Sequence, residues 1–251
     1  MQTVLEVFLP ESCLLCGARA GEGAALLPPG RHVNGLRAWD RPHLCALCWT
    51  VLQGASPKRL LHTESSPDLT VVGGVITKPV VVILVGALKY YGVRGVAWPL
   101  ARLASRGWEQ AVTIGGAVDY LIPVPLHPSR QRSRGFNQAE LLARLVASRF
   151  AVPILPGILR RYRCTTQLAK LSSDFAIRHD NVRGAFEALP PPKATRRRVG
   201  LVDDLITSGA TILAATDALV AAGWQVAWAL APALASFDHS ETALDSPQGR
   251  P

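Results

Sequence analysis

The hydrophobic pattern changes at residue 69, and from there it predicts strands alternating with helices. Residues 69–75 and 118–124 are apolar runs rich in β-branched side chains, and the second ends at prolines that cannot continue a sheet ladder. Residues 80–90 and 93–106 are longer and are predicted helices. The pattern further predicts strands at 154–159, 199–202 and 224–230 and helices at 137–149 and 211–222.

The helix at 137–149 carries the clearest local signals. Asn137 is a favoured N-cap residue, and Glu140 follows three residues later, as in a capping box. Four apolar side chains at helical spacing then form one face, namely Leu141, Leu142, Leu145 and Val146. Because strands and helices alternate along the chain, we expect an α/β domain with a mostly parallel sheet covered by helices on both faces.

Three segments lie outside this regular pattern. Residues 1–61 are rich in Cys, Pro and Gly and predict a small stapled module, which a polar linker at 62–68 joins to the α/β domain at 69–235. Residues 236–251 predict a disordered tail. Within the domain, residues 160–183 are polar and basic, so they are predicted to form a mobile loop.

The chain of 251 residues has a net charge of +9, and the positive charge is concentrated in one stretch. Residues 126–198 contain 15 Lys and Arg against 4 Asp and Glu, whereas the rest of the chain contains 12 against 14. Such a patch suits a polyphosphate ligand or a nucleic acid, but a solvated basic surface has the same composition. Composition alone does not separate these interpretations.

The sequence shows no segment suited to a membrane or to secretion. The longest apolar stretch, at 80–88, is far shorter than a bilayer span. Residues 1–9 include Glu6 and no basic residue, unlike a secretory signal. We therefore expect a cytoplasmic protein without membrane insertion.

The strongest chemical signal is the sequence V-G-L-V-D-D-L-I-T-S-G-A-T-I at 199–212. A predicted buried strand leads into the carboxylates of Asp203 and Asp204, then into a turn of small and hydroxylated residues, and then into a helix. The turn consists of Thr207, Ser208, Gly209, Ala210 and Thr211. Ligands of open α/β sheets bind at the carboxyl ends of strands, so we expect a binding site here.

This order of residues suits a ribose 5-phosphate. N–H groups at a helix N-terminus converge on a phosphate, the helix dipole favours the anion, and small side chains leave room for its approach. Two carboxylates would repel a phosphate in contact with them, but one ribose away they can accept hydrogen bonds from the 2- and 3-hydroxyls. No G-x-G-x-x-G follows a strand and no Walker lysine is present, which argues against a dinucleotide site or a P-loop.

The motif at 199–212 resembles the phosphoribosyl pyrophosphate signature of type I phosphoribosyltransferases. Further blocks resemble the ComF group of phosphoribosyltransferase-like proteins, which is named for a role in DNA uptake. These blocks are L-K-Y-Y-G at 88–92, P-V-P-L-H-P-S-R-Q-R-S-R-G-F-N-Q-A-E-L-L-A at 123–143, and a third at 163–186. With two N-terminal C-x-x-C pairs, the resemblance covers about residues 5–232 and implies a type I phosphoribosyltransferase fold.

The resemblance also implies roles for basic residues. The pyrophosphate half of the ligand would meet Lys89, Arg130, Arg132 and Arg134, and a hood loop over the site would carry Arg163, Gln167, Arg178 and Asn181. The three alternating arginines lie between a strand end and a helix start, which is a second phosphate-binding geometry. Lys89 lies in an apolar helical stretch and either meets a phosphate or snorkels to water, and any one of the arginines can equally be a surface charge.

Two C-x-x-C pairs, separated by 28 residues, mark the N-terminal module: Cys13 with Cys16, and Cys45 with Cys48. In a reduced cytoplasm this spacing points to a structural Zn²⁺ held by four thiolates, with a pair of disulfides as the alternative. A closed zinc shell has no open position, so its role would be in folding or docking.

For an enzyme, these residues predict pentosyl transfer, in which pyrophosphate leaves C1 of the ribose and a nitrogen nucleophile enters. Mg²⁺ and basic residues would take up the charge of the leaving group, and Asp203 and Asp204 would position the diol. The acceptor stays open because no residue clearly binds a base. One alternative is a non-catalytic accessory factor that binds single-stranded DNA, or a DNA-uptake helicase partner, through the same fold. Another is a purine-salvage enzyme, against which the cysteine module argues.

Overall fold

The computed structural model describes residues 13, 48, 50, 52, 56–61, 69–163, 182–192 and 197–235. Most of the predicted N-terminal module, the linker, the middle of the hood loop and the C-terminal tail lie outside these residues. Among the helices of the described part, none is long and apolar enough to cross a membrane.

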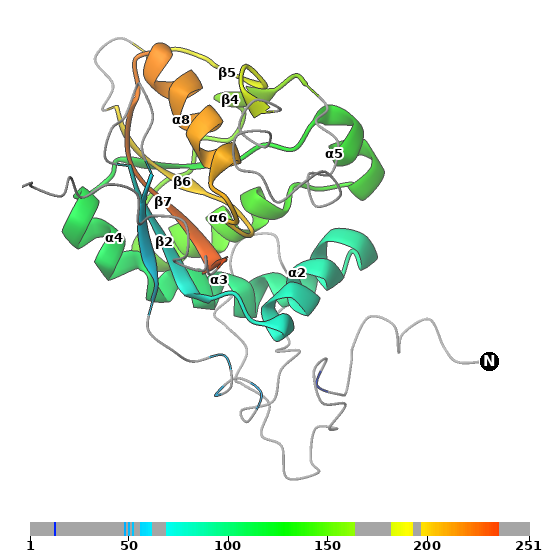
Figure 1. Cartoon of the computed structure of the whole chain (residues 1–251). Helices are drawn as coiled ribbons and strands as arrows, with labels where there is room; N and C mark the ends of the chain where they lie inside the picture. The colour runs from blue at the N-terminus through cyan, green and yellow to red at the C-terminus, as the bar shows by residue number, and fades with distance from the viewer. Residues whose placement is uncertain are drawn as a thin grey trace, which may run out of the picture.

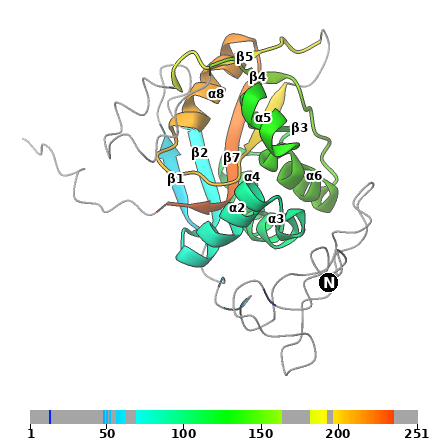
Figure 2. The ribbon, with the colours of Figure 1, turned by 90° about the vertical axis from the view of Figure 1, so that its right-hand side faces the viewer.

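A five-stranded sheet forms the centre of the molecule (Figures 1 and 2). Its strands follow the order β1 (Lys58–Leu61), β2 (Leu69–Ile76), β7 (Gln225–Leu234), β6 (Arg198–Val202) and β3 (Tyr120–Pro123). Strand β1 pairs with β2 in antiparallel orientation, and the other three pairings are parallel. The prediction of a mostly parallel sheet is confirmed, and β1 extends the sheet with residues that precede the predicted start of the domain.

Helices cover both faces of the sheet, with α8 on one side and α3 and α4 on the other (Figure 1). The first face carries α8 (Ala210–Ala221) and a small hairpin of β4 (Leu159–Arg161) and β5 (Phe186–Ala188). The second face carries α3 (Ala97–Arg106), α4 (Trp108–Gly115) and α6 (Gln138–Phe150). The expected covering of both faces is therefore present.

Strand residues alternate between two hydrophobic clusters, as a sheet buried on both faces requires. In β2, Val71 packs into the cluster under α8, whereas Val72 packs into the cluster with α3. The same alternation occurs in β6 between Leu201 and Val202. The approach of α3 is close, because a Cβ placed on Gly74 would overlap the carbonyl of Leu103.

Two helices lie at the carboxyl edge of the sheet, α2 (Pro79–Tyr91) below and α5 (Pro128–Arg134) above in Figure 1. Helix α2 confirms the prediction at 80–90. The predicted helix at 93–106 is divided, because a short 3₁₀ turn, η1 (Arg94–Val96), leads into α3. Helices α4 and α5 and strand β5 lie in stretches for which the hydrophobic pattern predicts no element.

The N-cap of α6 forms as predicted. The Asn137 side chain accepts a hydrogen bond from the N–H of Ala139 at 3.1 Å and donates one to the carbonyl of Val124 at 3.0 Å. The capping box is wrong, because Glu140 instead forms an ion pair with Arg144 at 2.7 Å one turn along the helix.

The predicted strand at 154–159 is misplaced. Ile154 forms an isolated bridge with Leu121, whereas the strand itself begins at Leu159 and pairs with β5. A short apolar run without clear alternation does not fix where a strand begins. The neighbouring arginines 160 and 161, predicted to begin the mobile loop, therefore belong to β4.

Candidate functional site

The acidic pair lies at the carboxyl end of β6, between β7 and β3 in the sheet. The N–H of Asp203 donates to the carbonyl of Leu230 on β7 at 3.0 Å, which fixes the backbone at the strand end. The N–H of Asp204 donates to Oδ1 of Asp203 at 2.8 Å. Asp203 is half-buried, and Asp204 is only 6% exposed. Both carboxylates therefore lie at the strand end where the sequence motif predicts a site.

Lys89 reaches this pair from the last turn of α2. Its Nζ lies 2.7 Å from Oδ1 of Asp204. Burial lowers the pKa of Lys89, but the charge and hydrogen bond of Asp204 and the charge of Asp203 outweigh it, so the pKa is raised above its ordinary value. The ammonium group therefore meets carboxylates inside the site, and its contact with a phosphate stays a prediction.

Asp203 has a raised pKa. Burial raises the pKa of Asp203 to about 7, and the charge of Asp204 adds to this effect. The charges of Lys89 and Arg161 and the hydrogen bond from Asp204 act in the opposite direction. Near neutral pH Asp203 therefore takes up or releases a proton readily.

The small-residue turn joins the acidic pair to the N-terminus of α8. Gly209 is the N-cap with a left-handed φ of 87°, and a Cβ at this position would lie 2.5 Å from Cδ1 of Leu61. The motif therefore needs glycine both for its backbone conformation and for space. Thr207 is exposed at the turn, whereas Ser208 is 6% exposed.

The first turn of α8 presents backbone N–H groups. The earliest hydrogen bond of the helix runs from the N–H of Leu213 to the carbonyl of Gly209, so the N–H groups of residues 210–212 have no acceptor within the helix. The N–H of Ala210 makes a long 3.4 Å contact with Oγ of Ser208. No acidic side chain lies in this first turn. The arrangement suits an anion, as the sequence predicts.

Helix α5 separates the three alternating arginines. Arg130 and Arg134, four positions apart, both line a cavity of about 650 Å³ together with Lys89. Arg132 is exposed on α5 and is not among the residues that line this cavity. The reason is helical geometry, since residues two apart on a helix point to different sides. The structure thus brings together three of the four residues predicted for pyrophosphate.

The hood loop is described only at its two ends. Arg163 donates from its guanidinium to the carbonyl of Arg183 at 3.2 Å, which joins the ends beyond the β4–β5 hairpin. The other predicted hood residues, Gln167, Arg178 and Asn181, lie outside the described residues. A contact between Nε2 of His127, the N-cap of α5, and the carbonyl of Tyr162 at 3.0 Å links the start of the loop to the arginine helix.

Sequence reasoning missed Arg161. This residue ends β4, its guanidinium lies 5.2 Å from the ring centre of Phe186, and its charge lowers the pKa of Asp203. The run Arg160-Arg161-Tyr162-Arg163 offers no local signal that singles out the second arginine. The pairing of β4 with β5 determines which of these arginines lies near Asp203.

The cysteines are described in part. Cys13 is 2% exposed and belongs to the hydrophobic cluster that includes α3, and Cys48 packs against the same cluster. Each predicted C-x-x-C pair thus places one member against this cluster. Cys16 and Cys45 lie outside the described residues, and the residues that are described contain no group of three or more His, Cys, Asp or Glu arranged for a metal. The zinc ion stays a prediction.

The fold is that of an α/β protein with a mostly parallel sheet, in which the carboxyl ends of the strands, where the acidic pair and the N-terminus of α8 lie, are the expected place for a ligand. No family model matches the chain. It is 33% identical over 174 residues to competence protein F of Haemophilus influenzae, covering 67% of this chain and 74% of that protein. The chain therefore belongs to the competence protein F, or ComF, family, as its motifs predict.

Other similarities involve DNA utilization proteins and a phosphoribosyltransferase. The chain is 29% identical over 202 residues to DNA utilization protein YhgH of Salmonella typhi, covering 80% of each protein, with the same values for YhgH of Salmonella typhimurium. Among solved structures it resembles orotate phosphoribosyltransferase from Aeropyrum pernix, with a TM-score of 0.31 and 19% identity over 72% of this chain and 77% of that one.

Proposed function

We propose that this protein binds phosphoribosyl pyrophosphate with Mg²⁺ and transfers its phosphoribosyl group to a nitrogen acceptor. The observation that carries the proposal is the placement of Asp203 and Asp204 at the end of β6, directly before the open N-terminus of α8. The acidic pair and the helix N-terminus thus stand one short turn apart. This order supports a ligand that carries a diol and a phosphate on one small sugar.

In this proposal the turn at 207–211 binds the 5-phosphate. The N–H groups at the start of α8 donate to its oxygens, and the hydroxyls of Thr207, Ser208 and Thr211 add donors. Gly209 keeps the backbone open to the ligand. The carboxylates of Asp203 and Asp204 then accept hydrogen bonds from the 2- and 3-hydroxyls, for which an ionised pair is best suited.

The pyrophosphate half lies toward α2 and α5. Lys89, Arg130 and Arg134 line one cavity and would receive the charge of the leaving group as the bond to C1 lengthens. Lys89 already contacts Asp204, so it stands at the junction between the diol and the leaving group. Asp203 and Asp204 would also hold Mg²⁺ through its water shell, and the ion when bound supplies further neutralisation of the pyrophosphate.

The relatives suggest the process that this activity serves. Two of them are named as DNA utilization proteins and another as a competence protein. We therefore propose a role in DNA uptake or use, with single-stranded DNA or a DNA-uptake helicase as the partner. A protein that keeps the ligand site but only binds DNA is the second candidate, favoured by these names and by the arginines on α5.

Titration calorimetry with phosphoribosyl pyrophosphate and Mg²⁺ tests the first proposal. Binding should be lost in the double variant Asp203→Asn/Asp204→Asn. It should persist in Asp119→Asn, which removes a carboxylate just before β3, at the edge of the sheet opposite the acidic pair. Pyrophosphate release should then appear with some member of a panel of nitrogen bases. Wild-type protein that gives no heat with the ligand would refute the proposal.

A second measurement separates the enzyme from the accessory factor. Single-stranded DNA binding that survives Asp203→Asn/Asp204→Asn, weakens in Arg130→Ala/Arg134→Ala and falls steeply with salt would support a DNA-binding role. Binding of the sugar phosphate without pyrophosphate release for any acceptor would favour the non-catalytic candidate.

A further inference from the structure

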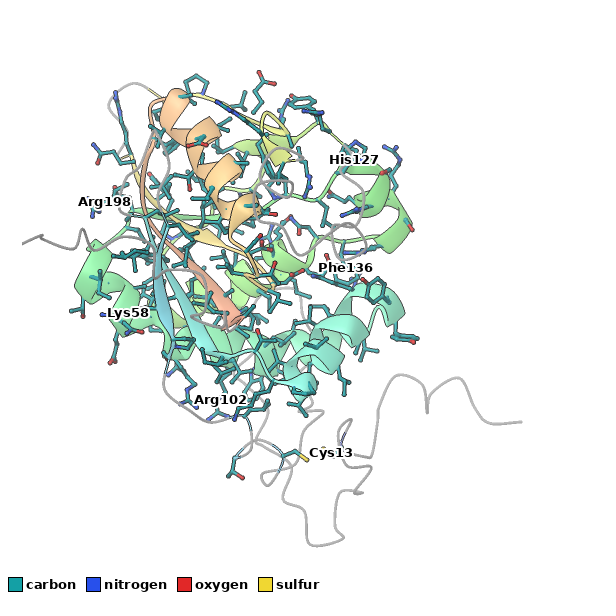
Figure 3. The ribbon with its side chains drawn as sticks, viewed as in Figure 1. Cys13, Lys58, Arg102, His127, Phe136 and Arg198 are labelled. Carbon is teal, nitrogen blue, oxygen red and sulfur yellow. The ribbon has the colours of Figure 1, made fainter. Side chains whose placement is uncertain are left out.

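The cavity between α2 and α5 has aromatic walls that the proposed reaction does not use. Besides its cations it is lined by Tyr90, the next-to-last residue of α2, and by Phe136, which follows α5. The Tyr90 side chain is 64% exposed, and Phe136 is half-buried. Figure 3 shows Phe136 in the region between the two helices. Two rings from segments far apart in the sequence therefore face one space.

Each ring is paired with an arginine. The guanidinium carbon of Arg134 lies 5.6 Å from the ring centre of Tyr90, and that of Arg94 lies 4.8 Å from the ring centre of Phe136. Such pairs hold the planar groups in place by cation–π attraction. Aromatic rings and guanidinium planes are the surfaces on which proteins stack unpaired bases.

The charge of the cavity indicates an anionic ligand. Its lining contains the three cations Lys89, Arg130 and Arg134 and the hydroxyls of Ser129 and Ser133, and no carboxylate is among the described lining residues. Its volume of about 650 Å³ falls within the range of sites that enclose a small organic molecule. A pyrophosphate group alone is far smaller than such a molecule, so the cavity has room for a ring as well.

From this combination we propose that the cavity binds a nucleotide unit, with its base against Tyr90 and Phe136 and its phosphate on Arg130 and Arg134. The site is distinct from the 5-phosphate turn and from the acidic pair, but it shares Lys89, Arg130 and Arg134 with the proposed pyrophosphate site, so a nucleotide and pyrophosphate would compete for these cations. The nucleotide unit comes either from a free nucleoside monophosphate or from a single strand of DNA. Both sources present the same base and phosphate.

Fluorescence or calorimetric titration of the full chain tests this site with three probes: thymidine monophosphate, a short oligothymidylate, and 2-deoxyribose 5-phosphate, which lacks a base. The base-containing probes should bind more tightly than the sugar phosphate. Tyr90→Leu and Phe136→Leu should each weaken their binding by roughly 5- to 150-fold, the effect expected for losing one stacking contact. Tyr90→Phe should retain the affinity because the ring remains.

Tyr91→Leu is the matched control, since Tyr91 is 82% exposed and is not among the cavity lining. Binding of the mononucleotide would assign the site to free nucleotides, and binding of the oligonucleotide alone would assign it to a strand. Both outcomes support the nucleotide site. Equal affinity for 2-deoxyribose 5-phosphate, or a loss in Tyr91→Leu as large as in Tyr90→Leu, would overturn it.

Two further measurements keep the test decisive. Circular dichroism checks the fold of each variant. Because Tyr90 is largely exposed, its Leu and Phe variants test the stacking contact even when Phe136→Leu does not fold. Nucleotide binding should also survive in Asp203→Asn/Asp204→Asn. Tyr90→Leu removes a ring that the proposed reaction does not use, and the aspartate double variant removes carboxylates that the nucleotide does not need. Failure of one proposal can therefore be told from failure of the other, although both use Lys89, Arg130 and Arg134.

Discussion

Replacing Asp203 by asparagine should stabilise the protein increasingly as the pH rises from about 4 to about 7, with the full gain at and above neutral pH. In the folded protein, burial and the adjacent Asp204 raise the pKa of Asp203 from 3.8 to about 7. Between these two values the folded state keeps a proton that the unfolded state has released, so the free energy of unfolding falls as the pH rises. Asparagine cannot ionise and escapes this loss.

The magnitude follows from the size of the pKa change. One pKa unit corresponds to about 1.4 kcal/mol, so the free energy of unfolding of the wild type should fall by up to about 4 kcal/mol as the pH rises from about 4 to about 7. The asparagine side chain keeps an oxygen that can accept the hydrogen bond from the N–H of Asp204. The variant therefore changes charge with little change in shape.

Urea unfolding followed by circular dichroism at roughly pH 5 and pH 8 measures this difference. The gap between the variant and the wild type should widen as the pH rises from about 4 to about 7 and should level off above pH 7. Glu140→Gln, which removes one negative charge from the surface of α6, controls for the change in net charge. A gap that stays constant over this range would show that Asp203 ionises normally, and the account of the acidic pair would be refuted.

Three other outcomes are expected. Gly209→Ala should lower the free energy of unfolding by about 1–3 kcal/mol, because the new side chain meets both a φ of 87° and a close contact with Leu61. Urea unfolding of the double variant Gly209→Ala/Leu61→Ala separates the two causes. If the double variant is as stable as Leu61→Ala alone, backbone strain is ruled out. Lys89→Met leaves the buried Asp204 without its partner and should cost about 3 kcal/mol near neutral pH; a cost that does not shrink on acidification would argue against the ion pair. The purified chain should contain about one Zn²⁺, lost together with thermal stability on chelation, and metal analysis that finds none in freshly reduced protein would contradict the zinc prediction.

The sequence predicts those elements whose signals are local. Helix α6 is found because Asn137 caps it and its apolar face repeats at helical spacing. Strand β6, the acidic pair and α8 are found because a strand end, a turn and a helix start follow one another without interruption. In these stretches nearly all the information lies within a few residues.

Features that depend on pairing between distant segments are not predictable in this way. Helix α5 has seven residues without an apolar face, so no periodicity reveals it. Because this helix is not predicted, the three alternating arginines look in the sequence like one cluster of charge. The helix instead turns Arg132 away from Arg130 and Arg134. The ion pair of Lys89 with Asp204 and the contact of Tyr90 with Arg134 exist only because α2 is brought to the carboxyl edge of the sheet.

Strand β1 has a consequence for how the protein can be shortened. Its last residue, Leu61, is 6% exposed and occupies the space directly beneath Gly209. A chain trimmed to begin at residue 69 would retain the acidic pair and the 207–211 turn, yet it would lose the edge strand and leave a hole under that turn. Weak binding by such a fragment would therefore report a missing support and not a missing ligand contact, and trimming should stop before Lys58.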